Sequence, residues 1–479
     1  MGRRNKTKRL VEGEVVDIGA KGMAVCRTDE GEVFLVQDAV PGDRISALLI
    51  RKRKGMWTGS IQEILRLSPH RVDPPCIHFE YCGGCKWQNL SYSSQIELKE
   101  KSVREAMRRI GGLNIGKFFP IIGCDEIYEY RNKLEFTFSD QRWLTEAEMR
   151  DRDEQTELKG LGFHRPGRFD KVLDVRECLL QRSPSNGIRN HIREKALELG
   201  LSFYNARSQE GYLRNLIIRT AETGDLMVIL IVKEKDQEAL DALLSDLLSA
   251  FPEITSLQYV VNPKVNDTIF DLPVHVFHGE PYMTEKLGEK LFHIGPKSFF
   301  QTNSRQAKVL YDQVVRFADF DGDEIVYDLY SGLGSIGIYL ADRVRKVVGI
   351  EEVEEAVEWS LKNSELNAAE NCSYFKGDVR EVLTDAFIAR HGPPDVLIVD
   401  PPRAGLHPDV VDFILGLEPN KIIYVSCNPA TQARDMAVWK EKYECVAMQP
   451  VDMFPHTSHI ENVALLHLVK EKSDDVTTQ

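Results

Sequence analysis

The pattern of hydrophobic and polar positions divides the chain into three parts. Residues 9 to 66 carry short runs of alternating apolar and polar residues, separated by Gly and Pro turns such as Val40-Pro-Gly-Asp43. Alternation with a period of two predicts strands with one buried face, and several short strands of this kind predict a small antiparallel, OB-like β-barrel. The Pro-rich run from Ser68 to Pro75 then predicts a linker to the second part.

The second part mixes helical and extended patterns, which predicts an α+β domain. Apolar residues recur at helical spacing from Gln95 to Ile110, whereas the highly charged segment Asp140 to Lys159 predicts a protruding hairpin or a mobile loop. The other predicted helices are Asn186–Leu199 and Gln237–Leu248, and the predicted strands are Leu134–Phe138, Gly160–Phe163, Val172–Val175, Leu213–Arg219, Asp225–Val232 and Ser256–Asn262.

From about residue 305 the chain alternates between helices and strands that are apolar on both faces. Such strands are buried on both sides, so the pattern predicts a parallel sheet covered by helices, a doubly wound α/β domain. The predicted parallel strands are Glu324–Leu329, Lys346–Ile350, Ser373–Lys376, Asp395–Val399 and Lys421–Val425, and late strands around Cys445–Val451 and Asn462–Val469 would complete the sheet.

Length and composition narrow the class of protein. With 479 residues and 42% hydrophobic content, the chain is too long for one ordinary core and has enough apolar side chains for two or three domains. No apolar run is long enough to span a bilayer, and the N-terminus lacks the apolar stretch of a signal peptide. Nine cysteines, an odd number, suit thiols or metal ligands better than disulfides. We therefore expect a cytoplasmic protein with no membrane partner.

The net charge of -13 argues at first against a nucleic-acid partner, but the charge is unevenly distributed. Basic residues cluster at Arg3 to Arg9 and at Arg51-Lys-Arg-Lys54. A basic patch on an acidic protein can still contact phosphates, while the acidic remainder discourages unspecific binding. Either cluster could equally be a solvated face.

A turn rich in glycine follows the first strand of the predicted parallel sheet. Asp328-Leu-Tyr-Ser-Gly-Leu-Gly-Ser335 lies between this strand and a helix, the place where α/β folds bind nucleotide-like ligands. Glu351 ends the second strand, where a carboxylate can accept hydrogen bonds from ribose hydroxyls. Because the turn lacks a full dinucleotide fingerprint, S-adenosylmethionine fits it better than NAD. The alternative is a tight turn beside a surface acid.

Two further motifs end the fourth and fifth predicted parallel strands. Asp400-Pro-Pro-Arg403 is a stiff loop that presents an acid, and Tyr424-Val-Ser-Cys-Asn-Pro-Ala-Thr431 places Cys427 where a strand runs into a turn. A free cysteine taken alone is usually buried and inert. Here the thiol, the acid and the glycine turn should meet at one edge of one sheet, which is not expected of a structural cysteine.

Four other cysteines form a separate array. Cys76, Cys82 and Cys85 have the spacing C-x5-C-x2-C, and Cys178 lies far downstream. Four thiolates with one distant member suit a 4Fe-4S cluster or a tetrahedral zinc ion. Gly83-Gly84 lets the backbone bend around a bulky inorganic core, which favours the cluster over zinc.

With these motifs assembled, the whole chain resembles the 23S ribosomal RNA uracil-5-methyltransferases of the bacterial RumA type. The motifs that carry the resemblance are Ser298-Phe-Phe-Gln-Thr-Asn303, Asp328-Leu-Tyr-Ser-Gly-Leu-Gly334, Asp400-Pro-Pro-Arg403, Ser426-Cys-Asn-Pro429 and His459-Ile-Glu461. The resemblance implies a multidomain fold. It comprises a TRAM barrel at residues 1–66, a central iron-sulfur domain at 67–95 and 125–270, and a Rossmann-like methyltransferase domain at 96–124 and 271–479.

The resemblance also implies roles for individual residues. Cys427 would be the nucleophile and Glu461 the base. Ser335 and Asp378 stand where relatives often have Asn, a departure near the cofactor. Taken singly, Gln301 could be a helix cap and Tyr330 a core aromatic. The residues implied to bind S-adenosylmethionine are Gln301, Tyr330, Ser335, Glu351, Asp378 and Asp400, and those implied to hold the metal cluster are Cys76, Cys82, Cys85 and Cys178.

The implied reaction explains why one thiol and one carboxylate are needed. Carbon 5 of uracil is a poor nucleophile until a thiolate adds to carbon 6, and a base must later remove the proton from carbon 5. A thiol with an ordinary pKa of about 8.5 is mostly protonated at neutral pH, so we expect polar neighbours to favour the thiolate of Cys427. The target base must also leave its RNA stack.

The expected partner is ribosomal RNA, with the protein acting as a monomer. The expected RNA contacts are Arg131-Asn-Lys133 and the basic segment Arg51 to Lys54, although either could be a solvated face. One alternative is a transfer-RNA uracil-5-methyltransferase, although that group generally lacks the barrel and the cysteine array. Another is a non-catalytic RNA-binding factor with a degenerate methyltransferase domain, against which the intact Cys427 and Glu461 argue.

Overall fold

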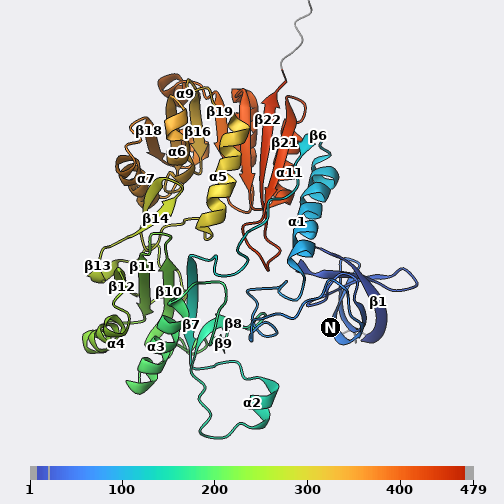
Figure 1. Ribbon diagram of the computed structural model, residues 1–479, viewed down its shortest axis with the longest axis vertical. Coiled ribbons are helices and arrows are strands. Elements are labelled where there is room, and N and C mark those ends of the chain that lie inside the picture. Colours follow the sequence, from blue (N-terminus) through green and yellow to red (C-terminus); the bar gives the residue numbers. More distant parts are fainter. Residues whose placement is uncertain (1–7, 20–21, 470–479) are drawn as a thin grey trace, which may run out of the picture.

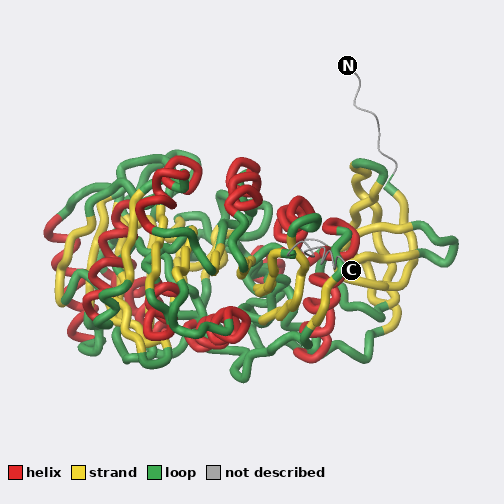
Figure 2. Tube along the Cα trace, turned by 90° about the horizontal axis from the view of Figure 1, so that it is seen from above, coloured by secondary structure: helices red, strands yellow, loops and turns green. Residues whose placement is uncertain are grey.

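The computed structural model describes residues 8–19 and 22–469, which form a barrel, a central sheet and a larger C-terminal sheet (Figure 1). The outer ends of the predicted first and last domains, residues 1–7 and 470–479, lie outside the described residues. The barrel stands at one end of the molecule when it is seen from above (Figure 2). Among the described residues, no helix is long and apolar enough to cross a membrane.

The N-terminal strands close into a barrel in the order β1-β2-β3-β5-β4. Its interior is filled by alternate apolar residues such as Val15, Phe34 and Ile45, which are almost fully buried. The pair β3 and β5 is parallel, so the prediction of a purely antiparallel barrel was wrong for the contact that closes it. The strands are β1 (Arg9–Ile18), β2 (Ala24–Arg27), β3 (Val33–Val36), β4 (Arg44–Arg53) and β5 (Met56–Arg66).

The central sheet has the order β13-β12-β11-β10-β7-β8-β9, and its strands β10 and β11 are buried along their whole length. Helices α3 and α4 share one apolar cluster with the sheet, whereas Ile217, Ile229 and Val260 belong to the cluster that continues into the C-terminal part. The elements are β7 (Lys133–Ser139), β8 (Gly160–His164), β9 (Val172–Asp174), α3 (Ser185–Glu198), β10 (Leu213–Thr220), β11 (Leu226–Val232), α4 (Gln237–Ala250), β12 (Ser256–Val261) and β13 (Val274–Gly279).

The charged segment between β7 and β8 protrudes from the molecule (Figure 1) and carries a short helix, α2 (Glu146–Arg150). Thr145 and Glu148 form a capping box at its start, which satisfies free backbone N–H groups at the helix N-terminus. The charge pattern had predicted a protruding hairpin or a mobile loop and had not indicated this helix.

The C-terminal sheet has the order β18-β17-β16-β19-β20-β22-β21-β6. The neighbouring strands β18, β17, β16, β19 and β20 pair in parallel, as predicted. Strand β22 pairs with β20 and β21 in antiparallel orientation. The strands are β16 (Ile325–Leu329), β17 (Lys346–Glu351), β18 (Cys372–Lys376), β19 (Val396–Val399), β20 (Lys421–Ser426), β21 (Tyr443–Val451) and β22 (Glu461–Leu468), and the helices are α6 (Ser335–Leu340), a 3-10 turn (Ala341–Arg343), α7 (Glu354–Leu366), α8 (Val379–Val382), α9 (Asp385–His391), α10 (Pro408–Leu417) and α11 (Pro429–Trp439).

Two connections bring distant segments to this sheet. Strand β6 (Ile115–Phe118) pairs in parallel with β21 at the sheet edge, and α1 (Tyr92–Ala106), extended by a π-helical turn at Met107–Gly111, packs against α11. The hairpin of β14 (Met283–Leu287) and β15 (Lys290–Ile294) and the helix α5 (Ser304–Ala318) lead from the central sheet into the C-terminal sheet. The sequence pattern had not indicated this hairpin or helix.

Candidate active site

A cavity of about 780 Å³ opens at the carboxyl edge of the parallel strands. Ligands of open α/β sheets bind at this edge, because the strand ends and the loops that follow them converge there. Six of the predicted site residues line the cavity, namely Gln301, Tyr330, Glu351, Asp400, Cys427 and Glu461.

Cys427 is held between the end of β20 and the first turn of α11. The Ser426 hydroxyl accepts a hydrogen bond from the Asn428 N–H at 3.1 Å, and the Asn428 side-chain oxygen accepts one from the Ala430 N–H as the N-cap of α11. The Asn428 side chain also donates to the Arg403 carbonyl at 2.9 Å, which ties this turn to the Asp400-Pro-Pro-Arg403 loop. The Ser-Cys-Asn-Pro motif thus fixes the backbone on both sides of the thiol.

The thiol of Cys427 lies in a surrounding that disfavours the thiolate. Burial, and then the carboxyl groups of Glu461 and Asp400, raise the pKa of Cys427 to about 11, although the Arg403 guanidinium opposes the shift. The expectation that polar neighbours would favour the thiolate was wrong for the free protein. Burial together with the two carboxyl groups outweighs the effect of Arg403.

We expect the alkylation of Cys427 by iodoacetamide to rise about tenfold per pH unit from about pH 7 to about pH 10. Only the thiolate reacts, and a pKa of about 11 leaves most of the thiol protonated over this range. Mass spectrometry of the Cys427 peptide measures the rate. A plateau that begins below about pH 8 would show that the thiolate is already formed in the free protein.

Asp400, which is partly buried, and Glu461, which is buried, are neighbouring carboxyl groups beside the thiol. Burial raises the pKa of Asp400 to about 7. Burial and the charge of Asp400 raise the pKa of Glu461 well above its ordinary value, against the opposing effect of Arg403. Two neighbouring carboxyl groups cannot both ionise easily, because each negative charge disfavours the other. A buried carboxyl group of this kind is a strong base once it is ionised.

The glycine turn after β16 is organised around Glu351. One carboxylate oxygen of Glu351 accepts the Gly332 N–H at 2.9 Å, and the other accepts the Val353 N–H at the same distance. Tyr330 adopts a left-handed backbone with φ of 66°, which turns the chain sharply out of the strand. Gly334 is also left-handed, and a Cβ there would lie 2.5 Å from the Tyr374 hydroxyl, so the turn requires glycine at this position.

Two predicted cofactor residues do not line the cavity. The Ser335 hydroxyl shares a hydrogen bond of 2.8 Å with the Tyr311 hydroxyl. Asp378 is the N-cap of α8 and pairs with Arg380, whose guanidinium lowers the pKa of Asp378 to about 2. Both side chains are therefore occupied by structural contacts.

The cavity is also lined by residues that the sequence analysis did not assign to it. Arg403 and His459 lie inside quoted motifs and could have been found there, whereas Phe454 lies in none. Burial lowers the pKa of His459 to about 4, so this imidazole is neutral at physiological pH. Phe270 and Phe299 are exposed at 71% and 72% and border the same cavity, which gives it an aromatic rim.

The four cysteines of the predicted metal site surround one separate cavity of about 350 Å³. Burial raises the pKa of each of the four thiols. Among the residues that the structure describes, no group of three or more His, Cys, Asp or Glu side chains is arranged so that it could hold a metal ion. Arg131 lines both this cavity and the one beside Cys427, so the two sites are neighbours.

The predicted RNA contacts differ in their surroundings. Asn132 is buried and its side chain donates to the Gln301 carbonyl at 2.9 Å. Burial lowers the pKa of Lys133. Of these three residues, Arg131 lines the cavity. The segment Arg51–Lys54 is exposed at the tip of the β4–β5 hairpin.

Comparison with known proteins identifies several similar chains. Residues 282–469 match the family described as tRNA (Uracil-5-)-methyltransferase. A protein of Bacteroides thetaiotaomicron named as an uncharacterized RNA methyltransferase is 49% identical over 94% of this chain and 100% of its own length. A Chlorobaculum tepidum protein of the same description is 39% identical, and the match covers 95% of both chains.

One solved structure is similar along nearly the whole chain. It is the Pyrococcus abyssi tRNA (uracil-54, C5)-methyltransferase in complex with S-adenosyl-L-homocysteine. The TM-score is 0.74 and the sequence identity 30%, and the match covers 95% of this chain and 100% of the other.

Proposed function

The chain belongs to the S-adenosylmethionine-dependent RNA uracil-5-methyltransferase family, and we propose that it methylates carbon 5 of a uridine in 23S ribosomal RNA through a covalent adduct of Cys427. It would act as a monomer. The observation that carries the proposal is that Cys427, Asp400 and Glu461 line one cavity and influence one another electrostatically.

The proposed steps use one thiol and one carboxylate. The Cys427 thiolate adds to carbon 6 of uracil and converts the ring into an enolate that is nucleophilic at carbon 5. After carbon 5 has taken up the methyl group, the Glu461 carboxylate removes the proton from carbon 5. The thiolate then leaves carbon 6, which restores the double bond and frees the methylated base. Arg403, beside Cys427, favours the thiolate when it forms.

The methyl donor would occupy the part of the cavity lined by Gln301, Tyr330 and Glu351. S-adenosylmethionine supplies an electrophilic methyl group on a positive sulfonium. Aromatic and acidic side chains suit this ligand, because they attract the sulfonium and accept hydrogen bonds from ribose hydroxyls. The fit of this part of the cavity supports S-adenosylmethionine as cofactor.

The choice of ribosomal RNA rests on the resemblance of the sequence motifs to the ribosomal enzymes. A second candidate is methylation of transfer RNA. It is favoured by the similarity, at 30% identity over 95% of this chain, to an enzyme that acts on tRNA uracil-54. The barrel does not separate the two candidates, because the match to this enzyme covers 95% of this chain and therefore includes most of the barrel.

Mapping of 5-methyluridine in RNA from cells that lack the protein separates the two candidates. We expect one 23S ribosomal position to lose its modification and to regain it when the purified protein and S-adenosylmethionine are added. A loss confined to transfer RNA would replace the ribosomal proposal with the second candidate. Intact modification at every position would contradict both.

We also propose that the four cysteines hold a 4Fe-4S cluster. The backbone N–H of Gly84 donates to the Cys82 sulfur at 3.4 Å. A Cβ at Gly83 would lie 2.5 Å from Pro166, so the glycine lets this turn pack closely against Pro166. Four thiols around a cavity suit a core several ångströms wide better than one zinc ion, whose thiolates converge at about 2.3 Å.

Protein purified without oxygen is expected to contain about four iron atoms per chain and to absorb broadly in the visible range. The variant Cys82→Ser should lose both iron and absorbance, because the array then has three thiolates. Stoichiometric zinc without visible absorbance would replace the cluster with the zinc alternative.

A further inference from the structure

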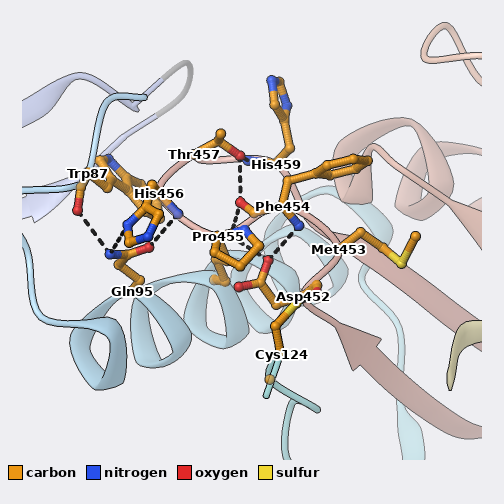
Figure 3. Close-up of polar contacts among 12 residues, drawn as sticks. Trp87, Gln95, Cys124, Asp452, Met453, Phe454, Pro455, His456, Thr457 and His459 are labelled. Carbon is orange, nitrogen blue, oxygen red and sulfur yellow. Dashed lines mark hydrogen bonds and ion pairs between the residues drawn. The ribbon is translucent and has the colours of Figure 1, made fainter. Parts of the chain in front are cut away.

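A buried polar network holds the loop that leads to Glu461 (Figure 3). This segment, residues 452–460, connects β21 to β22 and is called the base loop below, because Glu461 follows it directly. Its residues Phe454 and His459 line the cavity beside Cys427. The base loop thus lies beside the thiol and directly precedes Glu461, which pairs with Val451 across the two ends of the loop.

The centre of the network is an ion pair between Lys99 of α1 and Asp452 of the base loop. The Lys99 ammonium lies 2.6 Å from the Asp452 carboxylate, and both side chains are fully buried. Lys99 also donates to the Phe454 carbonyl at 2.9 Å, and the same Asp452 oxygen accepts the Phe454 N–H at 2.9 Å. One lysine thus contacts the base loop at two points.

The other carboxylate oxygen of Asp452 is held by a second chain of hydrogen bonds. It accepts the Tyr92 hydroxyl at 3.0 Å, and that hydroxyl accepts the Cys124 N–H at 2.6 Å. The Cys124 thiol donates to the Asp452 carbonyl at 2.9 Å, and the Asn303 side chain donates to the Met453 carbonyl at 3.0 Å. Each polar group of Asp452 therefore has a fixed partner.

A second attachment holds the far side of the base loop, as Figure 3 shows. The side-chain oxygen of Gln95 accepts a hydrogen bond from the His456 backbone N–H at 2.8 Å. The side-chain NH2 group of Gln95 donates to the Trp87 backbone carbonyl at 2.9 Å. The backbone N–H groups of Lys86 and Trp87 donate to the His456 carbonyl at 2.9 and 3.0 Å. His456 has a left-handed backbone with φ of 66°, a conformation that a non-glycine residue keeps only when its surroundings impose it.

A fully buried ion pair is weak evidence for stability, since apolar residues of similar volume often replace such a pair without loss. Such a pair can instead fix one conformation of the chain, here that of the base loop. We propose that Lys99, Asp452 and Tyr92 are positioning residues that hold the base loop so that Glu461 faces carbon 5 of the bound uracil. This inference rests on the proposed function and assigns the network a role in the proton-removal step.

The test follows tritium from the methyl group of S-adenosylmethionine. The substrate is total RNA from cells that lack the protein, and the reaction with purified full-length protein is stopped by denaturation. Tritium in free RNA reports complete turnover, whereas tritium that stays bound to protein reports an adduct that is methylated but not resolved. A misplaced Glu461 slows only the last step, so it raises the second quantity relative to the first.

We expect Asp452→Asn and Lys99→Met to lower turnover at least about tenfold and to raise the protein-bound fraction of tritium by a similar factor. Tyr92→Phe removes a single oxygen from the network and should still fold, so it should show a smaller change in the same direction. Binding of S-adenosylhomocysteine should stay within about twofold, because none of the three residues lines the cavity.

The matched control is Asp43→Asn. Asp43 is also fully buried and pairs with Arg71 at 2.8 Å, but in the barrel. The variant Asp43→Asn should lower the melting temperature of the protein, and no protein-bound tritium should accumulate. The proposal is overturned if Tyr92→Phe and the ion-pair variants turn over like the wild type, or lose turnover without protein-bound tritium. A wild-type protein that transfers no tritium to RNA would instead refute the proposed function.

Discussion

Replacing Cys427 with alanine is expected to lower methyl transfer to RNA by a factor of about 10⁴ or more. The reason is chemical: without a thiolate at carbon 6, carbon 5 of uracil has too little electron density to attack a methyl sulfonium. The remaining cavity residues can still bind RNA and cofactor. Tritium transfer from S-adenosylmethionine to RNA from cells that lack the protein measures the loss.

Cys372→Ala is a suitable control for the loss of a thiol. Cys372 lies on β18, does not line the cavity and is partly buried like Cys427, so its removal should leave methylation near the wild-type rate. Unchanged methylation by Cys427→Ala would refute the nucleophile. An inactive wild type that still binds RNA would support the alternative of a non-catalytic RNA-binding factor.

Replacing Glu461 with glutamine is expected to stop the reaction one step later. The amide has nearly the shape of the carboxyl group but cannot take the proton from carbon 5, so the methylated base should stay bonded to Cys427. A band of protein cross-linked to RNA should accumulate on a denaturing gel, with turnover lowered by a factor of about 10² to 10⁴. Mass spectrometry should find the methylated nucleotide on the Cys427 peptide.

The double variant Cys427→Ala/Glu461→Gln provides the control, because it cannot form the bond and should show no cross-linked band. If Glu461→Gln turns over at the wild-type rate, another group removes the proton. His459 and Asp400, two other titratable side chains that line the cavity, would then be replaced first.

The meeting of Asp400 and Cys427 at one cavity could be predicted from the sequence, because both follow parallel strands and such strands end at the same edge of a sheet. Glu461 joins them because β22 is antiparallel and begins where its neighbours end. The roles of these residues stay predictions until they are tested. Their assembly needed only strand order and motif position.

Other properties of the site depend on contacts that no local pattern contains. The raised pKa of Cys427 results from burial and from the carboxyl groups of Glu461 and Asp400, which come from other parts of the sheet. The partner of the Ser335 hydroxyl lies on α5, a helix that the pattern had not indicated. The ion pair of Lys99 and Asp452 joins residues that are 353 positions apart in the chain. A buried lysine also looks like any other charged residue in a helix when only its sequence is read.

The position of β6 and α1 also bears on how the protein is made. Translation releases this segment long before β21 and α11, with which it packs. The C-terminal sheet therefore cannot be completed on the ribosome until the last strands emerge. A fragment limited to residues 282–469, the span that matches the family, would expose the edge of β21 and the face of α11 to association with other chains. The whole chain is therefore the unit to express.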